Sequence, residues 1–254
     1  MHITDDLGNT IILEKVPEKI ISLVPSVTKT VADLGGNDKL IAVTKFCKYP
    51  KTAVAALPKV GGPKKVKTGL IKTLNPDLIF AVKEENNKEQ IEQLQKEFPV
   101  VVFNIKNVDD ALNMIKTISV ILVTPDTGKK FTEEIRAGLE NLSLKKSVKT
   151  VYLIWKEPWM AAGTETFISS MMEYAAFENI ITGRYPVLQL KDMEQAQIIL
   201  LPSEPFNFTI KHKNELQHIF PEKTIYQVNG EMFSWYGTMM KEAIKYFEKM
   251  TKTY

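Results

Sequence analysis

The residues best suited to contact a ligand lie in loops that follow predicted strands. All three tryptophans, Trp155, Trp159 and Trp235, fall in such loops. Large aromatic side chains are unfavourable to solvate, so in loops they often contact a bound partner. The same loops also contain Phe206, Phe233 and Tyr236. The alternative, that these rings pack into the core of their own domain, stays open on the sequence alone.

A second group of loop residues is charged. The stretch from Lys45 to Lys72 holds eight lysines and no acidic residue. It could form a positive rim that attracts an anionic solute, or it could be a solvated face. Carboxylates in the predicted loops could pair for acid–base chemistry, dock onto a charged partner, or simply face water. These carboxylates are Glu84, Glu85, Glu157, Glu204 and Glu231.

Residue sets for metal binding or nucleophilic catalysis are missing from the sequence. The three histidines are His2, His212 and His218, and the last two lie six apart on a predicted helix, so they face different ways. No His/Cys/Asp cluster has the spacing of a bare metal site, and no Ser-His-Asp set or nucleophile elbow occurs. The single cysteine, Cys47, has no base nearby in sequence. No glycine-rich dinucleotide motif follows a predicted strand, which ranks a Rossmann-type nucleotide enzyme last.

Composition bounds the class of protein. The chain has 254 residues, 44% of them hydrophobic and 25% charged, as in a globular protein with one large or two small domains. A net charge of +3 is too small to indicate nucleic-acid binding. No basic-then-apolar leader is present at the start of the sequence. The protein is therefore expected to be either cytoplasmic or exported with a leader removed.

Strand and helix signals alternate along the chain, which predicts an α/β fold of two Rossmann-like lobes with mainly parallel sheets. In the first half, Ser26 is expected to cap a helix that ends at Gly35-Gly36. Predicted strands cover residues 20–24, 40–43, 77–82, 100–103, 150–154, 197–201 and 224–228. Predicted helices include residues 68–74, 86–97, 166–176, 190–195, 211–220 and 238–250.

One long helix is predicted between the two halves. Thr124 is a good N-cap, Pro125 fits the first helical position, and Asp126 suits the positive end of the helix dipole. One narrow apolar stripe follows, made of Phe131, Ile135, Leu139 and Leu142. We interpret it as a solvent-bathed backbone helix, residues 124–142, joining an N-terminal lobe, 1–123, to a C-terminal lobe, 143–254. The alternative is an amphipathic surface helix of a single domain.

Several segments resemble the periplasmic solute-binding proteins with a helical backbone, which serve ABC importers of ferric siderophores, haem and vitamin B12. The run I-I-S-L-V-P-S-V-T from Ile20 resembles their first strand and following cap. N-P-D-L-I-F-A from Asn75 resembles their K-P-D-L-V-I-A step, and D-D-L-G-N from Asp5 resembles their D-D-L-G-R hairpin. The single interdomain helix matches theirs in place and length. The resemblance covers nearly the whole chain.

Within that family the chain looks most similar to the cobalamin-binding branch. The segments that carry this resemblance begin at Thr44, Gly61, Lys83, Ile154 and Gly230. The resemblance implies a ligand held in the cleft between two lobes by Ser26, Lys45, Phe46, Gly62, Glu85, Asn86, Trp155, Lys156, Trp159, Phe206, Phe233, Trp235 and Tyr236. It also implies acids that dock onto the permease, for which Glu89, Glu204 and Glu215 are the candidates.

The resulting hypothesis is a monomeric, non-enzymatic solute-binding protein of an ABC importer. Its partners are a membrane permease and a small-molecule metal chelate, cobalamin or another corrinoid first, then a ferric siderophore or haem. No cofactor, bare metal ion or nucleic acid is expected. The alternative is a cytoplasmic tetrapyrrole-handling protein or chelatase-like enzyme of related fold.

Overall fold

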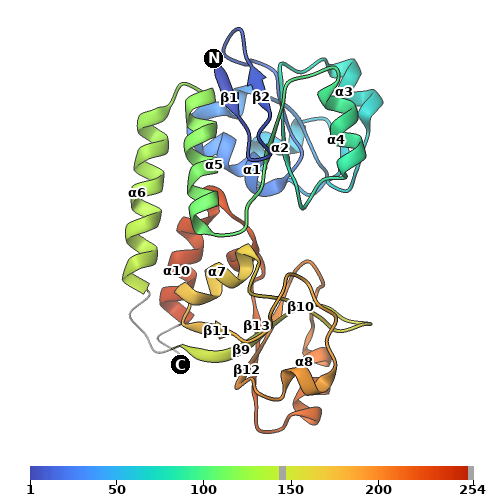
Figure 1. Ribbon diagram of the computed structural model, residues 1–254, viewed down its shortest axis with the longest axis vertical. Coiled ribbons are helices and arrows are strands. Elements are labelled where there is room, and N and C mark those ends of the chain that lie inside the picture. The colour runs from blue at the N-terminus through green and yellow to red at the C-terminus, as the bar shows by residue number, and fades with distance from the viewer. Residues whose placement is uncertain (143–146, 251–254) are drawn as a thin grey trace. The chain divides into compact units, whose positions relative to one another are not determined.

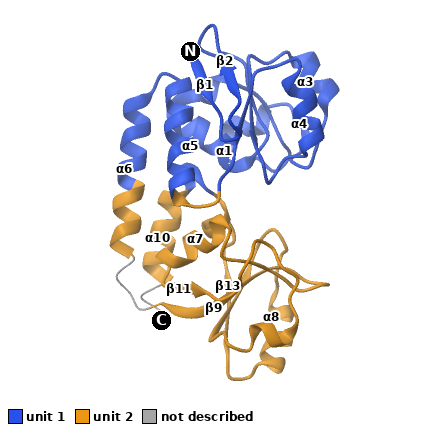
Figure 2. Cartoon of the chain, in the orientation of Figure 1, with its two compact units in different colours: residues 1–105, 109–134, 236–239 blue, residues 106–108, 135–235, 240–254 orange. Residues whose placement is uncertain are grey.

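Two β-sheets organise the fold, a parallel one in the first half of the chain and a mixed one in the second. The computed structural model describes residues 1–142 and 147–250. The chain divides into two compact units (Figure 1, Figure 2). Unit 1 comprises residues 1–105, 109–134 and 236–239, and unit 2 comprises residues 106–108, 135–235 and 240–254. No described helix is both long and apolar enough to cross a membrane.

The sheet of unit 1 is parallel throughout. Its strands, in spatial order, are β4 (Leu40–Val43), β3 (Ile20–Ser22), β7 (Leu78–Val82) and β8 (Val100–Phe103). Strands β7 and β8 are buried at every position, as expected of apolar runs covered on both faces. The helices of the unit are α1 (Pro25–Val31), α2 (Lys51–Ala56), α3 (Thr68–Leu74), α4 (Lys88–Gln95) and α5 (Val108–Ile121), the last beginning in unit 2.

Two short antiparallel hairpins complete unit 1. They are β1 (His2–Thr4) with β2 (Thr10–Ile12), and β5 (Gly61–Gly62) with β6 (Lys65–Val66). Irregular turns follow α1, namely η1 (Ala32–Gly36) and η2 (Asn37–Lys39). Gly35 has φ 90° there, a left-handed conformation that ends the helix as the sequence predicted.

Unit 2 has a mixed sheet around the long strand β9 (Val148–Trp155). Strand β12 (Ile198–Pro202) pairs parallel with β9 and with β13 (Thr224–Val228). Strand β9 also pairs with β10 (Met160–Ala162) in the antiparallel direction and with β11 (Phe177–Asn179) in the parallel direction. The helical segments are α7 (Phe167–Tyr174), η3 (Leu190–Met193), α8 (Ile210–Ile219), α9 (Glu231–Ser234), η4 (Gly237–Met239, in unit 1) and α10 (Met240–Met250).

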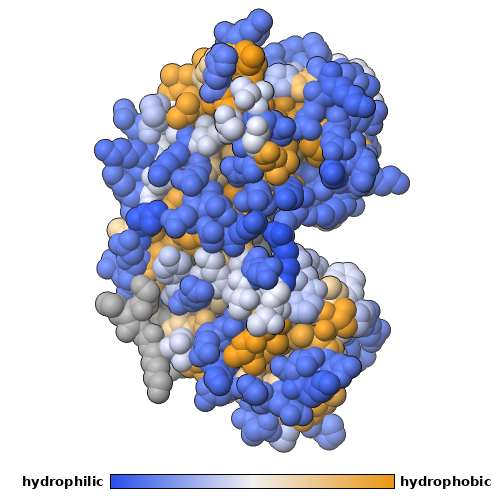
Figure 3. All heavy atoms as spheres, viewed as in Figure 1, coloured by the Kyte–Doolittle hydropathy of each residue, from blue (hydrophilic) through white to orange (hydrophobic). Residues whose placement is uncertain are grey.

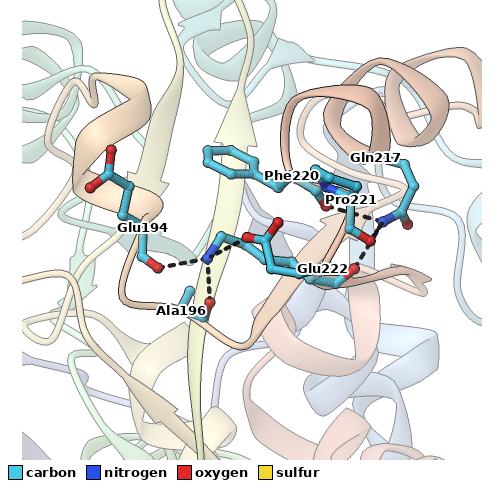
Figure 4. A network of polar contacts seen from close by, with 7 residues as sticks. Glu194, Ala196, Gln217, Phe220, Pro221 and Glu222 are labelled. Carbon is cyan, nitrogen blue, oxygen red and sulfur yellow. Dashed lines mark hydrogen bonds and ion pairs between the residues drawn. The ribbon is translucent and has the colours of Figure 1, made fainter.

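A buried lysine ties the loops at one end of this sheet together. Lys223, only 8% exposed, donates to the backbone oxygens of Glu194 (2.6 Å) and Ala196 (2.8 Å). Its ammonium also lies 3.5 Å from a carboxylate oxygen of Glu222 and 5.2 Å from the centroid of Phe220 (Figure 4). The side-chain amide of Gln217 bonds three backbone oxygens of the same turn, those of Phe220, Pro221 and Lys223. This polar network fixes the approach to β13, because buried polar groups must find partners.

The long helix α6 (Pro125–Leu142) confirms the helix predicted after Thr124. It passes from unit 1 into unit 2 at Ile135. Its predicted stripe is buried at Ile135, Leu139 and Leu142, whereas Phe131 is half-buried. The prediction that this helix is bathed in solvent is wrong for one of its faces, where Gly128 and Thr132 are also buried.

Two glycines of α6 allow close helix packing, one in each unit. A Cβ on Gly128 would lie 2.2 Å from the hydroxyl of Ser119 on α5, and one on Gly138 would lie 2.7 Å from Ile244 on α10. Figure 1 shows α6 running beside these helices. The helix is therefore anchored in each unit by side-on packing.

The N-terminus of α1 differs from the prediction in its cap. The N-cap position is Val24, Pro25 is the first helical residue, and Ser26 lies within the helix, where it is 3% exposed. Proline with a fixed φ suits the first helical position, so the helix begins two residues earlier than predicted. Ser26 is thus a buried helix residue and not a cap.

The segment from Tyr236 to Met239 belongs to unit 1 although its neighbours on both sides belong to unit 2. Gly237 makes this possible. Its φ is 78°, and a Cβ there would lie 2.2 Å from the hydroxyl of Thr30 and 2.8 Å from Met114. The amide of Thr238 donates to the same Thr30 hydroxyl at 3.3 Å. Only glycine fits this left-handed, tightly packed position.

Candidate functional site

A pocket of about 690 Å³ lies at the carboxyl ends of the strands of unit 1. Strands β4 and β7 flank β3, so the loops that leave them meet at one edge of the sheet. The hairpin β5–β6 forms a further wall. The residues that line the pocket are Lys45, Phe46, Lys59, Gly61, Gly62, Pro63, Lys64, Lys65, Lys67, Glu84 and Glu85. Four predicted ligand residues, Lys45, Phe46, Gly62 and Glu85, are therefore brought together.

The hairpin wall is held from two sides. On the β4 side, the amide of Lys45 donates to the oxygen of Gly61 at 2.8 Å. On the α4 side, the amide nitrogen of Asn86 donates to the oxygen of Pro63 at 3.0 Å, while its oxygen accepts from the amide of Val82 at 2.8 Å. Asn86, predicted as a ligand residue, is 5% exposed, and in this structure it positions the wall.

Phe46 supplies an exposed ring at the pocket. Its side chain is 56% exposed, and the ammonium of Lys45 lies 4.9 Å from the ring centroid. A Cβ on Gly62 would lie 3.6 Å from the same ring. The pocket thus offers one apolar surface beside a row of positive charges, and no side chain at position 62 separates them.

Tyr236 anchors Glu85 at the pocket. The Tyr236 hydroxyl donates to Oε1 of Glu85 at 2.6 Å, and Ser26 also bonds the phenol oxygen. Burial, followed by the charge of Glu85, raises the pKa of Tyr236 well above its ordinary value of 10.0. The phenol therefore keeps its proton and remains a donor. Three predicted residues from distant parts of the sequence meet here.

Unit 2 carries an aromatic cluster made of Trp155, Trp159, Phe206 and Phe208. Trp155 is 45% exposed and meets Phe206 edge-on, with centroids 5.3 Å apart. Trp159 stacks on Phe208 at 6.3 Å with an interplanar angle of 8°. The cluster comes from the end of β9, the β9–β10 turn and the β12–α8 loop. Figure 3 shows hydrophobic side chains gathered on the face of unit 2 over β10 and α8.

A lysine orients part of this aromatic cluster. The ammonium of Lys156 lies 5.3 Å from the Trp159 centroid and forms an ion pair with Glu215 of α8. Cation–π contact and the ion pair hold the same side chain from two directions. Glu215, predicted to dock onto a permease, is thus paired within its own unit.

Other predicted residues are less accessible than expected. Phe233 is fully buried against Tyr152, Phe177 and Phe247, so for this predicted ligand residue the alternative of packing into the core of its own domain holds. Trp235 is 7% exposed. The short helix α9, which the sequence analysis missed, turns these side chains inward.

The remaining docking candidates differ in their surroundings. Glu204 accepts from the indole nitrogen of Trp235 at 2.6 Å and from the hydroxyl of Ser234 at 3.2 Å. Glu89 is exposed in the first turn of α4. Of the three, Glu89 is the one whose surroundings suit an external partner without rearrangement.

Residues missed by the prediction complete both surfaces. In unit 1 these are Lys59, Lys64, Lys65, Lys67 and Glu84, and in unit 2 Phe208. The acid-free lysine run was the available signal for the first set. Phe208 is 3% exposed and supports Trp159, whose ring stacks on it, a contact that no sequence pattern indicated.

Within residues 1–142 and 147–250, no group of three or more His, Cys, Asp or Glu side chains is placed to hold a metal ion. Cys47 is buried, 3.1 Å from the Thr28 hydroxyl and 3.2 Å from that of Thr44. Burial raises the pKa of this thiol. A low-pKa, exposed thiolate is what a reactive cysteine requires.

Comparison with known proteins decides the family. The profile of the periplasmic binding protein family matches residues 20–205. The chain belongs to that family. A curated relative, the vitamin B12-binding protein of Vibrio parahaemolyticus serotype O3:K6, is 28% identical over 204 residues, which are 77% of this chain and 71% of the relative.

Solved structures agree on the fold. The periplasmic vitamin B12 binding protein of Vibrio cholerae matches with a TM-score of 0.77 at 21% identity, covering 91% of this chain and 95% of that one. A periplasmic heme binding protein from Pseudomonas aeruginosa matches with a TM-score of 0.79 at 15% identity, covering 91% of each chain. The predicted family and the predicted α/β fold class are confirmed.

Proposed function

We propose that this protein is the solute-binding component of an ABC importer and that it binds a metal chelate without transforming it. The observation that carries the proposal is membership of the periplasmic binding protein family over residues 20–205. The relative from Vibrio parahaemolyticus is named for vitamin B12 binding, which favours a corrinoid. A ferric siderophore or haem is the next candidate, because structural relatives are named for heme binding.

Two surfaces suit a large, partly apolar chelate. The aromatic cluster of unit 2 offers the exposed ring of Trp155, and the pocket of unit 1 offers the exposed ring of Phe46. Aromatic rings with a few polar groups are typical of small-molecule sites. The proposal keeps the earlier expectation that each unit contributes one surface to the ligand. It assigns no catalytic residue and no resident cofactor.

The proposal also places the protein outside the cytoplasmic membrane, as a monomer that delivers its ligand to a membrane permease. Glu89, Glu204 and Glu215 stay the candidates for docking. Charged rim residues mainly change association rates, so an exposed acid such as Glu89 is the sharpest place to test docking.

Tryptophan fluorescence tests the binding function directly. The purified protein is titrated with cyanocobalamin, with haemin and with ferric siderophores, and binding of at least one is expected to quench emission. Trp155→Ala should weaken that binding by roughly tenfold or more, since aromatic hot spots cost over about 1.4 kcal/mol. The matched control is Val187→Ala, which truncates a 60% exposed side chain of unit 2 outside the aromatic cluster. Absence of quenching and of binding heat with every chelate would rule out the proposed function.

A further inference from the structure

The pocket of unit 1 carries an excess of positive charge. Five of its lining residues are lysines and two are glutamates, which leaves three positive charges in excess. Like charges gathered around a concave surface raise the local potential and attract anions. This feature goes beyond the need for an apolar surface and bears on which chelate the protein selects.

The lysines are not neutralised within the described part of the chain. The ammonium of Lys59 donates to the backbone oxygen of Val54, and that of Lys64 to the backbone oxygen of Glu84. Lys45 lies over Phe46. Among residues 1–142 and 147–250, no ion pair involves any of the five pocket lysines. These carbonyl and ring contacts orient the ammonium groups of Lys45, Lys59 and Lys64 but do not compensate their charge.

One glutamate of the pocket, Glu85, is bonded to a residue outside it. Glu85 accepts the short hydrogen bond of the Tyr236 hydroxyl, from a residue that does not line the pocket. Glu85 is therefore held towards Tyr236 by a bond that helps to satisfy its charge.

The backbone that carries three of these lysines is held in place before a ligand arrives. Lys64 and Lys65 lie on the β5–β6 hairpin, and Lys67 follows it. That hairpin is bonded to Asn86, and both the amide and the oxygen of Val66 are bonded to the side chain of Gln90, at 3.1 Å and 3.0 Å. A held backbone lowers the entropy cost of binding, because only the lysine side chains remain to be ordered.

From this geometry we infer that the chelate presents at least two anionic oxygen groups, carboxylate, phosphate or phenolate, to the lysine pocket of unit 1. The inference rests on the proposed function and narrows its ligand to an anionic chelate, which ranks an anionic ferric siderophore or haem ahead of a neutral corrinoid. The pocket volume of about 690 Å³ accommodates one charged edge of such a ligand while Phe46 contacts its hydrocarbon part.

The test compares chelates of similar size and different charge. Calorimetric titrations use the ferric complex of a linear tris-catecholate, which is anionic, and that of a linear tris-hydroxamate, which is neutral. Haemin, which carries two carboxylates, is the second anionic probe, and cyanocobalamin is the second neutral probe. We expect the tighter ligand to be an anionic one, by roughly tenfold or more, and its affinity to fall as ionic strength rises from about 0.05 M to about 0.5 M.

Single lysine variants locate the effect. Lys45→Gln, Lys64→Gln and Lys65→Gln are each expected to weaken the anionic chelate by roughly fivefold or more, because each removes one charge-assisted contact. The matched control is Lys96→Gln, an exposed lysine at the end of α4 that does not line the pocket, with a change below about twofold.

The outcomes separate the two proposals. If a neutral chelate binds as tightly as the anionic one and the lysine variants behave like Lys96→Gln, the inference is overturned while the proposed function stands. If no chelate binds at all, the proposed function fails and the inference fails with it.

Discussion

Replacing the buried Lys223 by methionine should destabilise unit 2 by about 2 kcal/mol. The substitution keeps most of the side-chain volume but removes the ammonium that bonds the oxygens of Glu194 and Ala196. A net hydrogen bond to a charged group contributes about 1.5–3 kcal/mol, and the two bonds share one ammonium, so they do not add fully. Burial of the charge offsets part of the gain, because desolvating an ammonium is unfavourable.

The assay is urea unfolding followed by tryptophan emission. All three tryptophans lie in unit 2, so emission reports the unit in which the change is made. A loss of about 2 kcal/mol corresponds to a melting temperature lower by about 4–8 °C for a chain of this size. The matched control is Lys211→Met, which removes an exposed lysine of α8 and should change stability by less than about 0.5 kcal/mol.

The reasoning is refuted if Lys223→Met unfolds at the same urea concentration as the control, with an unchanged slope. That result would mean that the two carbonyl oxygens find other partners at no cost. A second variant, Gln217→Leu, measures the contribution of the Gln217 amide separately from that of the Lys223 ammonium. It removes the three bonds to the oxygens of Phe220, Pro221 and Lys223 and leaves the ammonium in place. It should cost about 1 kcal/mol, because the three acceptors are part-buried or exposed and water replaces some of the lost bonds.

Two further predictions concern unit 1. Gly237→Ala should destabilise the protein by about 2 kcal/mol or more, measured by urea unfolding with circular dichroism, because alanine is strained at φ 78° and would clash with Thr30. Gly69→Ala within α3 should instead stabilise the protein, because a Cβ there meets nothing within 4 Å and helix propensity favours alanine by up to about 1 kcal/mol. Equal changes in stability at the two glycines would contradict this explanation. Hydrogen bonds from the amides of Glu18 and Lys19, the former the largest cause, hold the pKa of Asp77 below its ordinary value of 3.8. The ionised carboxylate therefore stabilises the fold at pH values above 3.8, and this stabilisation is lost as the pH falls through the lower pKa of the folded state. The loss of stability caused by Asp77→Asn should accordingly become smaller on acidification. A loss that does not change with pH would show that the charge of Asp77 plays no part.

Much of the fold could be predicted because its signals are local. The helix at residues 68–74 and the strands at residues 100–103 and 224–228 begin and end where the sequence analysis placed them. Asn75, with φ 46°, ends the first of these because the residue before a proline leaves the helical region. Apolar runs bounded by proline, glycine or asparagine suffice for such assignments. The division of the chain at residues 123 and 143 stays a prediction.

The candidate surfaces were harder to predict, because burial depends on contacts between distant segments. Trp155 and Trp235 both lie in loops after predicted strands, yet one is 45% exposed and the other 7%. Trp235 donates its indole hydrogen to Glu204, which lies 31 residues away in sequence, and no local pattern predicts such a partner. Likewise, whether the lysine run lines a pocket or a flat face depends on Asn86 bonding to Pro63, a contact that no local pattern reveals.

Both surfaces proposed for the ligand therefore depend on side chains that need not touch it. Asn86 holds the hairpin that carries the pocket lysines, and Glu215 holds the lysine that lies over Trp159. Because the contact residues sit on short loops, an error of about 1 Å in their placement is enough to weaken binding strongly. Substitutions at Asn86 or Glu215 should thus lower affinity through the geometry of their neighbours, while substitutions at exposed residues beside the same surfaces leave affinity intact. The proposed selectivity therefore depends on supporting polar contacts such as these as much as on the residues that would meet the solute.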